Sequence, residues 1–242
     1  MKELKYIVIG LALIVCALLL SRAYTYKYRA QDTIVVTGLG ETVFTSDLIV
    51  WNATLTAEAQ TVAAGYAQIE ANKLKVQKYL TDKGLPADAL VFEFVNVTKQ
   101  FDPIYNASGN WAGQRFTGYE LRQGLTVESA DVEKVETISR EISSLIAQGV
   151  AIEANAPDYY YTKLDDVKLG LIEKASADAR VRAEKIAENA GTKIGKVASA
   201  RMGVFQITGA NSNEEFAAGG SFNTSSRSKK ARITMRLEYR IK

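Results

Sequence analysis

The spacing of apolar and polar residues changes several times along the chain, and each change predicts a new element. Between residues 49 and 58 apolar and polar side chains alternate, as in a strand with one buried face. Between 61 and 83 apolar residues recur every three or four positions, as on one face of a helix. The same signatures predict strands at 33–44, 48–58, 90–100, 116–128, 150–161, 194–208 and 230–241, and helices at 61–83, 131–148 and 164–190.

This order of elements predicts an α+β fold. The elements follow one another as ββα-ββα-βα-ββ, without the strict alternation that a parallel doubly wound sheet requires. We therefore expect mostly antiparallel sheets packed with long amphipathic helices. Residues 31–242 form this body, and its similar helix-glycine-strand blocks indicate two related halves, about 31–128 and 129–242.

Residues 1–30 precede the body and have a different character. A short charged start leads into a run from Tyr6 to Leu20 that is apolar on every face. We expect one N-terminal membrane helix here. A cleaved signal peptide and a buried core helix are the alternatives, because these 15 residues rise only ~22 Å as a helix. The anchor residues would be Tyr6, Ile9, Leu13, Cys16 and Leu20.

The composition excludes most common kinds of catalytic site. The chain has no histidine and a single cysteine, Cys16. That excludes Ser-His-Asp and Cys-His triads, histidine-ligated zinc and haem, internal disulfides and iron–sulfur clusters. Because no pattern places two carboxylates opposite each other, we expect no catalytic residues, no cofactor, no metal and no enzyme activity. The net charge of +3 gives no indication of a nucleic-acid partner.

One aromatic segment has a functional interpretation. Phe101, Tyr105, Trp111 and Phe116 lie in or beside a long hairpin loop between two predicted strands. Long loops often serve recognition or assembly, and aromatic side chains dominate the energetics of interfaces. Contact with another subunit, local packing and ligand binding are the three interpretations. We take the four aromatic residues as the candidate oligomer interface.

Two glycine-containing segments have simpler interpretations. Gly38-Leu39-Gly40 follows a strand, as in dinucleotide-binding loops, but neither a third glycine nor a helix comes next. A tight turn or close backbone packing is therefore predicted there. Residues 211–228 are polar and glycine-rich, which predicts a flexible loop, and 216–222 are a candidate flap over a ligand.

Four segments of the body match a known family. They are IVVTGLGETVFTSDLIVWNATL, FTGYELRQGLTVES, EKASADARVRAEKIAENAGTKIGKVASA and KKARITMRLEYRIK. Through them the chain, from about Ile34 to Ile241, resembles the SIMPL-domain family. These are the YggE-like extracytoplasmic proteins, which include a periplasmic antigen of Brucella. The family's usual Gly-Glu-Gly is Gly38-Leu39-Gly40-Glu41 here.

The resemblance implies a bacterial envelope protein with an α+β fold. It also implies relatives associated with protection against oxidative stress, some of which form ring-like or channel-like homo-oligomers. We therefore expect a non-enzymatic periplasmic protein, tethered to the inner membrane by its N-terminal helix, whose partners are copies of itself and the bilayer. If the N-terminus is cleaved, the protein is secreted to the periplasm. The alternative is a periplasmic binding module for a small ligand, a lipid or an envelope protein.

Overall fold

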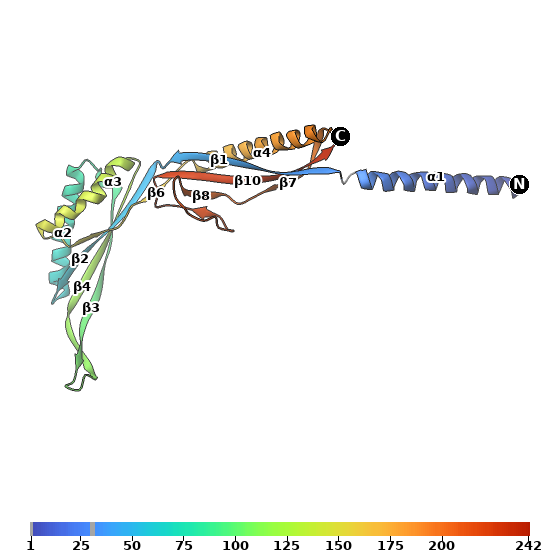
Figure 1. The fold of residues 1–242 in the computed structure, drawn as a ribbon. Coiled ribbons are helices and arrows are strands. Elements are labelled where there is room, and N and C mark those ends of the chain that lie inside the picture. The colour runs from blue at the N-terminus through green and yellow to red at the C-terminus, as the bar shows by residue number, and fades with distance from the viewer. Residues whose placement is uncertain (1, 30–31) are drawn as a thin grey trace.

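The computed structural model describes residues 2–29 and 32–242, with side chains 10–25 in the first helix. Two antiparallel-rich sheets, each covered on one face by helices, confirm the α+β fold (Figure 1). The helices are α1 (Lys2–Arg29), α2 (Val62–Asp82), α3 (Val132–Glu141) and α4 (Leu164–Asn189), with 3-10 turns at Ala87–Ala89 and Ile142–Gln148. The strands are β1 (Thr33–Thr45), β2 (Leu48–Ala59), β3 (Leu90–Tyr105), β4 (Trp111–Ser129), β5 (Ile152–Ala154), β6 (Asp158–Tyr160), β7 (Ile194–Met202), β8 (Gln206–Gly209), β9 (Ser221–Phe222) and β10 (Ser228–Ile241).

The first sheet, which we call the terminal sheet, consists of β1 and β7–β10. β10 pairs antiparallel with β1 along its length, and also with β7 and β8, while β9 adds to β8 in parallel. Helix α4 covers one face through a stripe of one leucine and four alanine side chains. Leu171, Ala175, Ala179, Ala183 and Ala187 of this stripe are buried against apolar residues of β1 and β10.

Two glycines of β1 allow α4 to lie directly on the strand. A Cβ atom at Gly38 would stand 2.1 Å from the carbonyl oxygen of Ala175, and one at Gly40 would stand 2.3 Å from that of Leu171. Both separations are far below van der Waals contact, so only glycine fits at either position. The prediction of close backbone packing is confirmed, and the alternative of a tight turn is wrong because β1 continues through both residues.

The second sheet, the central sheet, consists of β2–β6 with β3 at one edge. Its order is β3-β4-β2-β5, and β6 also pairs with β2. Helices α2 and α3 cover one face, where Ile69 and Val135 are fully buried. Trp51 is fully buried in this core, and its indole N–H donates to the carbonyl of Asn155 at 3.0 Å.

Several expected elements differ in detail. β1 and β2 lie in different sheets, and the chain crosses between them at Ser46 and Asp47. The expected helix 131–148 tightens into a 3-10 turn after Glu141, because 3-10 geometry is common at helix ends. The expected strand 150–161 is two short strands, since Pro157 between them cannot donate to a ladder. The stretch 194–208 divides into β7 and β8, and β9 lies within the expected loop.

The expected membrane-spanning helix is not found. α1 is helical, but neither its described side chains, 10–25, nor any other described helix forms a span long and apolar enough to cross a membrane. Leu13 and Leu20 are 65% and 71% exposed and Cys16 is exposed. Tyr6 and Ile9 lie outside the described side chains. The division of the body into two related halves stays a prediction.

Candidate functional site

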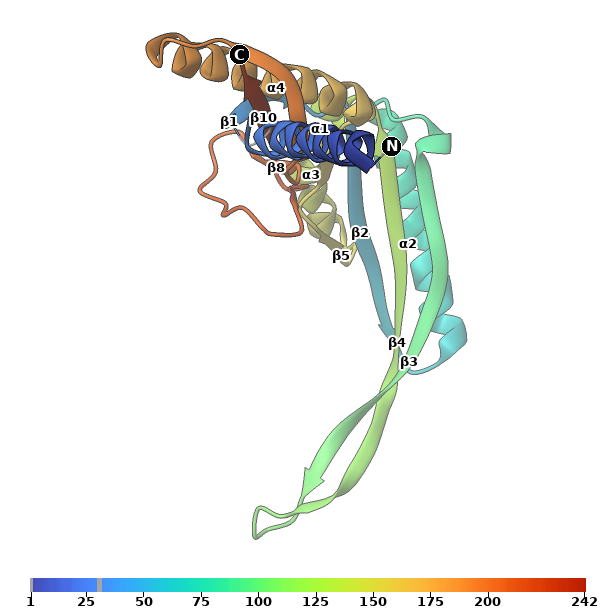
Figure 2. The same cartoon turned by 90° about the vertical axis from the view of Figure 1, so that its right-hand side faces the viewer.

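Strands β3 and β4 continue past the rest of the central sheet as a two-stranded hairpin, residues 100–118, which we call the arm. Figure 2 shows it extending beyond β2 and α2. β2 ends at Ala59, opposite Tyr119, whereas β3 and β4 remain paired as far as Tyr105 and Trp111. The arm strands therefore pair only with each other. An isolated two-stranded hairpin is marginally stable in water, so a second surface would stabilise it.

The four predicted interface residues all lie on the arm. Phe101 and Phe116 pack edge to face with ring centroids 5.7 Å apart, and Phe116 also packs on Tyr119 at 5.2 Å. Tyr105 and Trp111 pair across the tip and are 61% and 68% exposed. The prediction of a long loop between the strands is wrong, because most of this segment is strand and only residues 106–110 form the turn.

The turn at the tip has a defined geometry. The side-chain oxygen of Asn106 accepts the N–H groups of Ser108 and Asn110 at 3.0 and 2.9 Å. Gly109 has a φ of 78°, in the left-handed region that favours glycine. This turn fixes Tyr105 and Trp111 on opposite strands at the same level. Sequence reasoning missed Ile104, which is 45% exposed beside them, because only aromatic residues were considered.

A polar groove of about 560 Å³ lies at the base of the arm. The amide of Gln60 donates to the carbonyl of Thr117 at 2.8 Å and fastens the end of β2 to the arm. Gly118, with a φ of 147°, approaches so closely that a Cβ would stand 2.8 Å from the carbonyl oxygen of Ala59. These contacts set the direction in which the arm leaves the sheet. The groove is lined by Glu58, Ala59, Gln60, Gln100, Phe101, Asp102, Thr117, Gly118 and Tyr119.

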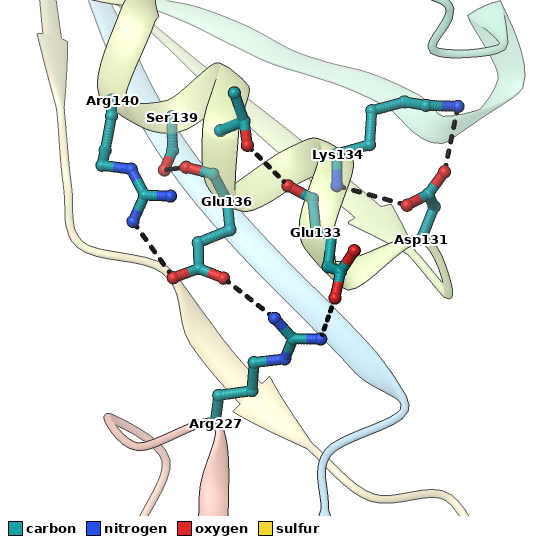
Figure 3. Close-up of polar contacts among 8 residues, drawn as sticks. Asp131, Glu133, Lys134, Glu136, Ser139, Arg140 and Arg227 are labelled. Carbon is teal, nitrogen blue, oxygen red and sulfur yellow. Dashed lines mark hydrogen bonds and ion pairs between the residues drawn. The ribbon is translucent and has the colours of Figure 1, made fainter.

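A cluster of ion pairs joins the two sheets (Figure 3). Arg227, just before β10, donates to Glu133 at 2.8 Å and to Glu136 at 3.5 Å, both on α3. Arg140 also pairs with Glu136 at 3.1 Å. Hydrogen bonding to Glu133 raises the pKa of Arg227, and burial is the main cause of the raised pKa of Tyr159 nearby. The cluster holds the terminal sheet against the helices of the central sheet, so its role is structural.

The glycine-rich loop after β8 is fastened rather than free. The carboxylate of Glu214 accepts the N–H of Gly209 at 3.1 Å and also a hydrogen bond from the Asn223 amide. The guanidinium carbon of Arg232 lies 5.0 Å from the ring centroid of Phe216. Beneath the loop is a groove of about 460 Å³, lined by Val204, Gln206, Phe216, Ala217, Ala218, Arg232, Ile233 and Thr234.

Neither region offers a concentration of metal ligands. In the part of the chain that the structure describes, no group of three or more histidine, cysteine, aspartate or glutamate side chains is placed to hold a metal. Two carboxylates, Glu58 and Asp102, line the groove at the base of the arm beside amides and aromatic rings, and the residues that line the groove beneath the glycine-rich loop include no acidic side chain. Such surfaces suit non-covalent contact with another molecule.

Comparison with known proteins places the chain in a family. No curated protein matches it. Among solved structures, a protein from Burkholderia cenocepacia provisionally named an amidohydrolase/peptidase is 14% identical, with a TM-score of 0.18. That match covers 60% of this chain and 37% of the other, and so weak a likeness indicates neither fold nor activity. The family model SIMPL, described as "Protein of unknown function (DUF541)", matches residues 34–240, and the chain therefore belongs to the SIMPL family.

Proposed function

We propose that this SIMPL protein is a non-enzymatic, extracytoplasmic protein that assembles with copies of itself through the arm. The observation that carries the proposal is the exposure of large apolar side chains on an unsupported hairpin. Tyr105 and Trp111 at its tip are both more than 60% exposed. Tyrosine and tryptophan in such positions are typical anchors of protein interfaces.

Burial of the arm against a second copy would satisfy two physical demands. It would remove aromatic surface from water, at roughly 25 cal/mol per Å² of apolar area. It would also cover the β3 edge, which otherwise presents unpaired backbone groups to solvent. A head-to-tail contact of this kind closes into a ring when its rotation divides a full turn. We propose such a ring or channel as the assembled form.

We also propose that α1 associates with the inner membrane and that the body lies in the periplasm. Figure 1 shows α1 extending away from the body. Its described leucines, such as Leu18 and Leu19, are 63% and 62% exposed, which is costly in water but favourable in lipid. The absence of cysteine from the body suits an oxidising compartment. Confinement to a plane would raise the effective concentration of subunits. Any protection against oxidative stress would be indirect, because the body lacks redox-active thiols.

Light scattering of the detergent-extracted full chain tests the assembly. We expect a defined oligomer for the wild-type protein. The double variant Tyr105→Ser/Trp111→Ser should be monomeric at micromolar concentration. Phe94→Ser is the matched control, because Phe94 is 78% exposed on the same strand but lies outside the arm. A wild-type protein that is monomeric throughout the micromolar range would refute the proposal.

The groove beneath the glycine-rich loop favours a second function, a binding module for a small ligand. Its apolar lining and the Arg232–Phe216 contact suit a molecule with one anionic or polar end. Native mass spectrometry of the purified protein would show a co-purified ligand. Phe216→Ala should release such a ligand, whereas Phe222→Ala, outside the residues that line the groove, should retain it.

A further inference from the structure

One end of the terminal sheet gathers three parts of the chain. Thr33 at the start of β1 pairs with Arg240 near the end of β10. Lys193, just before β7, exchanges backbone hydrogen bonds with Lys242 at 2.8 and 3.4 Å. In Figure 1 this end, marked C, is the part of the body nearest to α1. We call it the basic end, after its side chains Lys196, Arg240 and Lys242.

A groove of about 450 Å³ lies at the basic end. Three of its lining residues, Lys196, Arg240 and Lys242, carry a positive charge, and none carries an acidic side chain. The remaining residues are small or apolar, including Val197 and Ile241. The groove therefore offers three cationic side chains among small and apolar ones.

These cations differ from their neighbours in having no ion-pair partner. On the adjacent face of α4, Arg180 pairs with Glu184 and Lys185 with Glu188, each at 2.9 Å. Within the described residues, by contrast, no ion pair involves Lys196, Arg240 or Lys242.

Few acidic groups oppose this charge. The carboxylate of Glu238 accepts a hydrogen bond from the hydroxyl of Thr33 at 2.8 Å. Asp32 lies at the same end, where its carbonyl accepts the N–H of Ile241. Lys193, whose backbone pairs with that of Lys242, adds a further cation. The balance at this end is therefore positive, although the whole chain has a net charge of only +3.

We infer that the basic end binds the anionic phosphate headgroups of the bilayer with which α1 associates. This inference rests on the proposed membrane association of α1. A helix with exposed apolar side chains and a cluster of unpaired cations lie next to each other, and phospholipid is the partner that offers both chains and phosphates. Lysine and arginine form strong charge-assisted hydrogen bonds with phosphate oxygens.

Vesicle flotation of the full chain tests this inference. We compare vesicles of phosphatidylcholine, which is neutral overall, with vesicles that also contain anionic phosphatidylglycerol. The wild-type protein should bind the anionic vesicles at least about tenfold more tightly. The variant Lys196→Glu/Arg240→Glu/Lys242→Glu should lose this increment and retain binding to neutral vesicles. Lys75→Glu/Lys99→Glu/Lys163→Glu is the matched control, with the same charge change away from the basic end, and should retain most of the increment.

Each other outcome has a definite meaning. Equal binding of the wild-type protein to both kinds of vesicle would overturn the inference but would agree with the proposed membrane association of α1.

No binding to either kind of vesicle would overturn both the proposed membrane association and the inference. Loss of the increment on adding inorganic phosphate, but not chloride of equal ionic strength, would identify a site for free phosphate instead. Tight binding of an oligonucleotide that the triple variant loses, without a lipid increment, would also overturn it. Circular dichroism melting curves check that each variant is folded.

Discussion

The carboxylate of Asp178 on α4 accepts the backbone N–H of Leu39 on β1 at 2.8 Å. β1 is an edge strand of the terminal sheet, so this N–H has no strand partner. The same carboxylate pairs with Arg182 at 2.9 Å. The side chain of a helix therefore caps the free edge of the strand on which that helix packs. The interaction blunts the edge between the two glycines that bring α4 close.

The stability supplied by Asp178 should depend on pH. The hydrogen bond from Leu39, followed by that from Arg182, lowers the pKa of Asp178 in the folded chain. This contribution is therefore fully present above the unfolded pKa and is lost as pH falls through the lower folded pKa. In urea unfolding, the free energy of unfolding of Asp178→Asn should be about 1 kcal/mol lower than that of the wild-type protein at neutral pH. This difference should disappear below pH ~4. Glu173→Gln, on the exposed face of the same helix, is the control, and its free energy of unfolding should stay close to that of the wild-type protein at neutral pH.

Two glycine substitutions should act in opposite directions. Gly38→Ala places a Cβ 2.1 Å from the carbonyl oxygen of Ala175, so α4 must shift away from β1. We expect a loss of about 2–3 kcal/mol in the free energy of unfolding. Gly170→Ala lies in α4 with no atom within 4 Å of the new Cβ. Gly170→Ala should raise the free energy of unfolding by about 0.5–1 kcal/mol, because alanine has a higher helix propensity than glycine. Equal effects of the two substitutions in thermal unfolding would contradict the close approach of α4.

Arg227 should couple more strongly to Glu136 than to Glu133. Glu136 is 22% exposed and Glu133 is 78% exposed, so solvent screens the second pair more. Double-mutant cycles with Arg227→Gln should give a coupling energy of about 0.5–1 kcal/mol for Glu136 and less for Glu133. The opposite order would show that the shorter distance to Glu133 outweighs screening.

Lys229 should make stability rise with pH. Its side chain is 1% exposed, and its ammonium donates to the carbonyl of Asn223. Burial lowers its pKa, and Glu214 and Asp158 oppose this only in part. Unfolding therefore takes up a proton between the folded pKa and the unfolded value of ~10.4, so the folded state gains stability as pH rises through that range. In urea unfolding, the wild-type protein should gain stability relative to Lys229→Met as pH rises toward the unfolded pKa of ~10.4. Lys230→Met, at the half-buried next position, is the control, and a relative loss with rising pH would contradict the prediction.

The helices and strands of the body differ in how well the sequence predicts them. The period-two pattern of 48–58 and the helical pattern of 61–83 predicted β2 and α2 to within one or two residues. This was possible because the residues that one element buries on its inner face recur at short, regular spacings in the sequence. The aromatic residues from Phe101 to Phe116 were identified as a candidate surface. Their arrangement on a strand pair was not predicted, since Pro103 and the glycines resemble a loop. Pro103 is tolerated there because β3 is an edge strand.

By itself, the sequence determined the type of each main element, the family of the chain and the near absence of histidine and cysteine side chains. Only the tertiary structure decided that β1 pairs with β10, some 200 residues later, and that β2 enters a different sheet. The alternation of a strand specifies which face is buried, but any strand with a matching face satisfies that demand. The same holds for the cations of the basic end, which lie in two distant segments and become neighbours only when β7 and β10 pair.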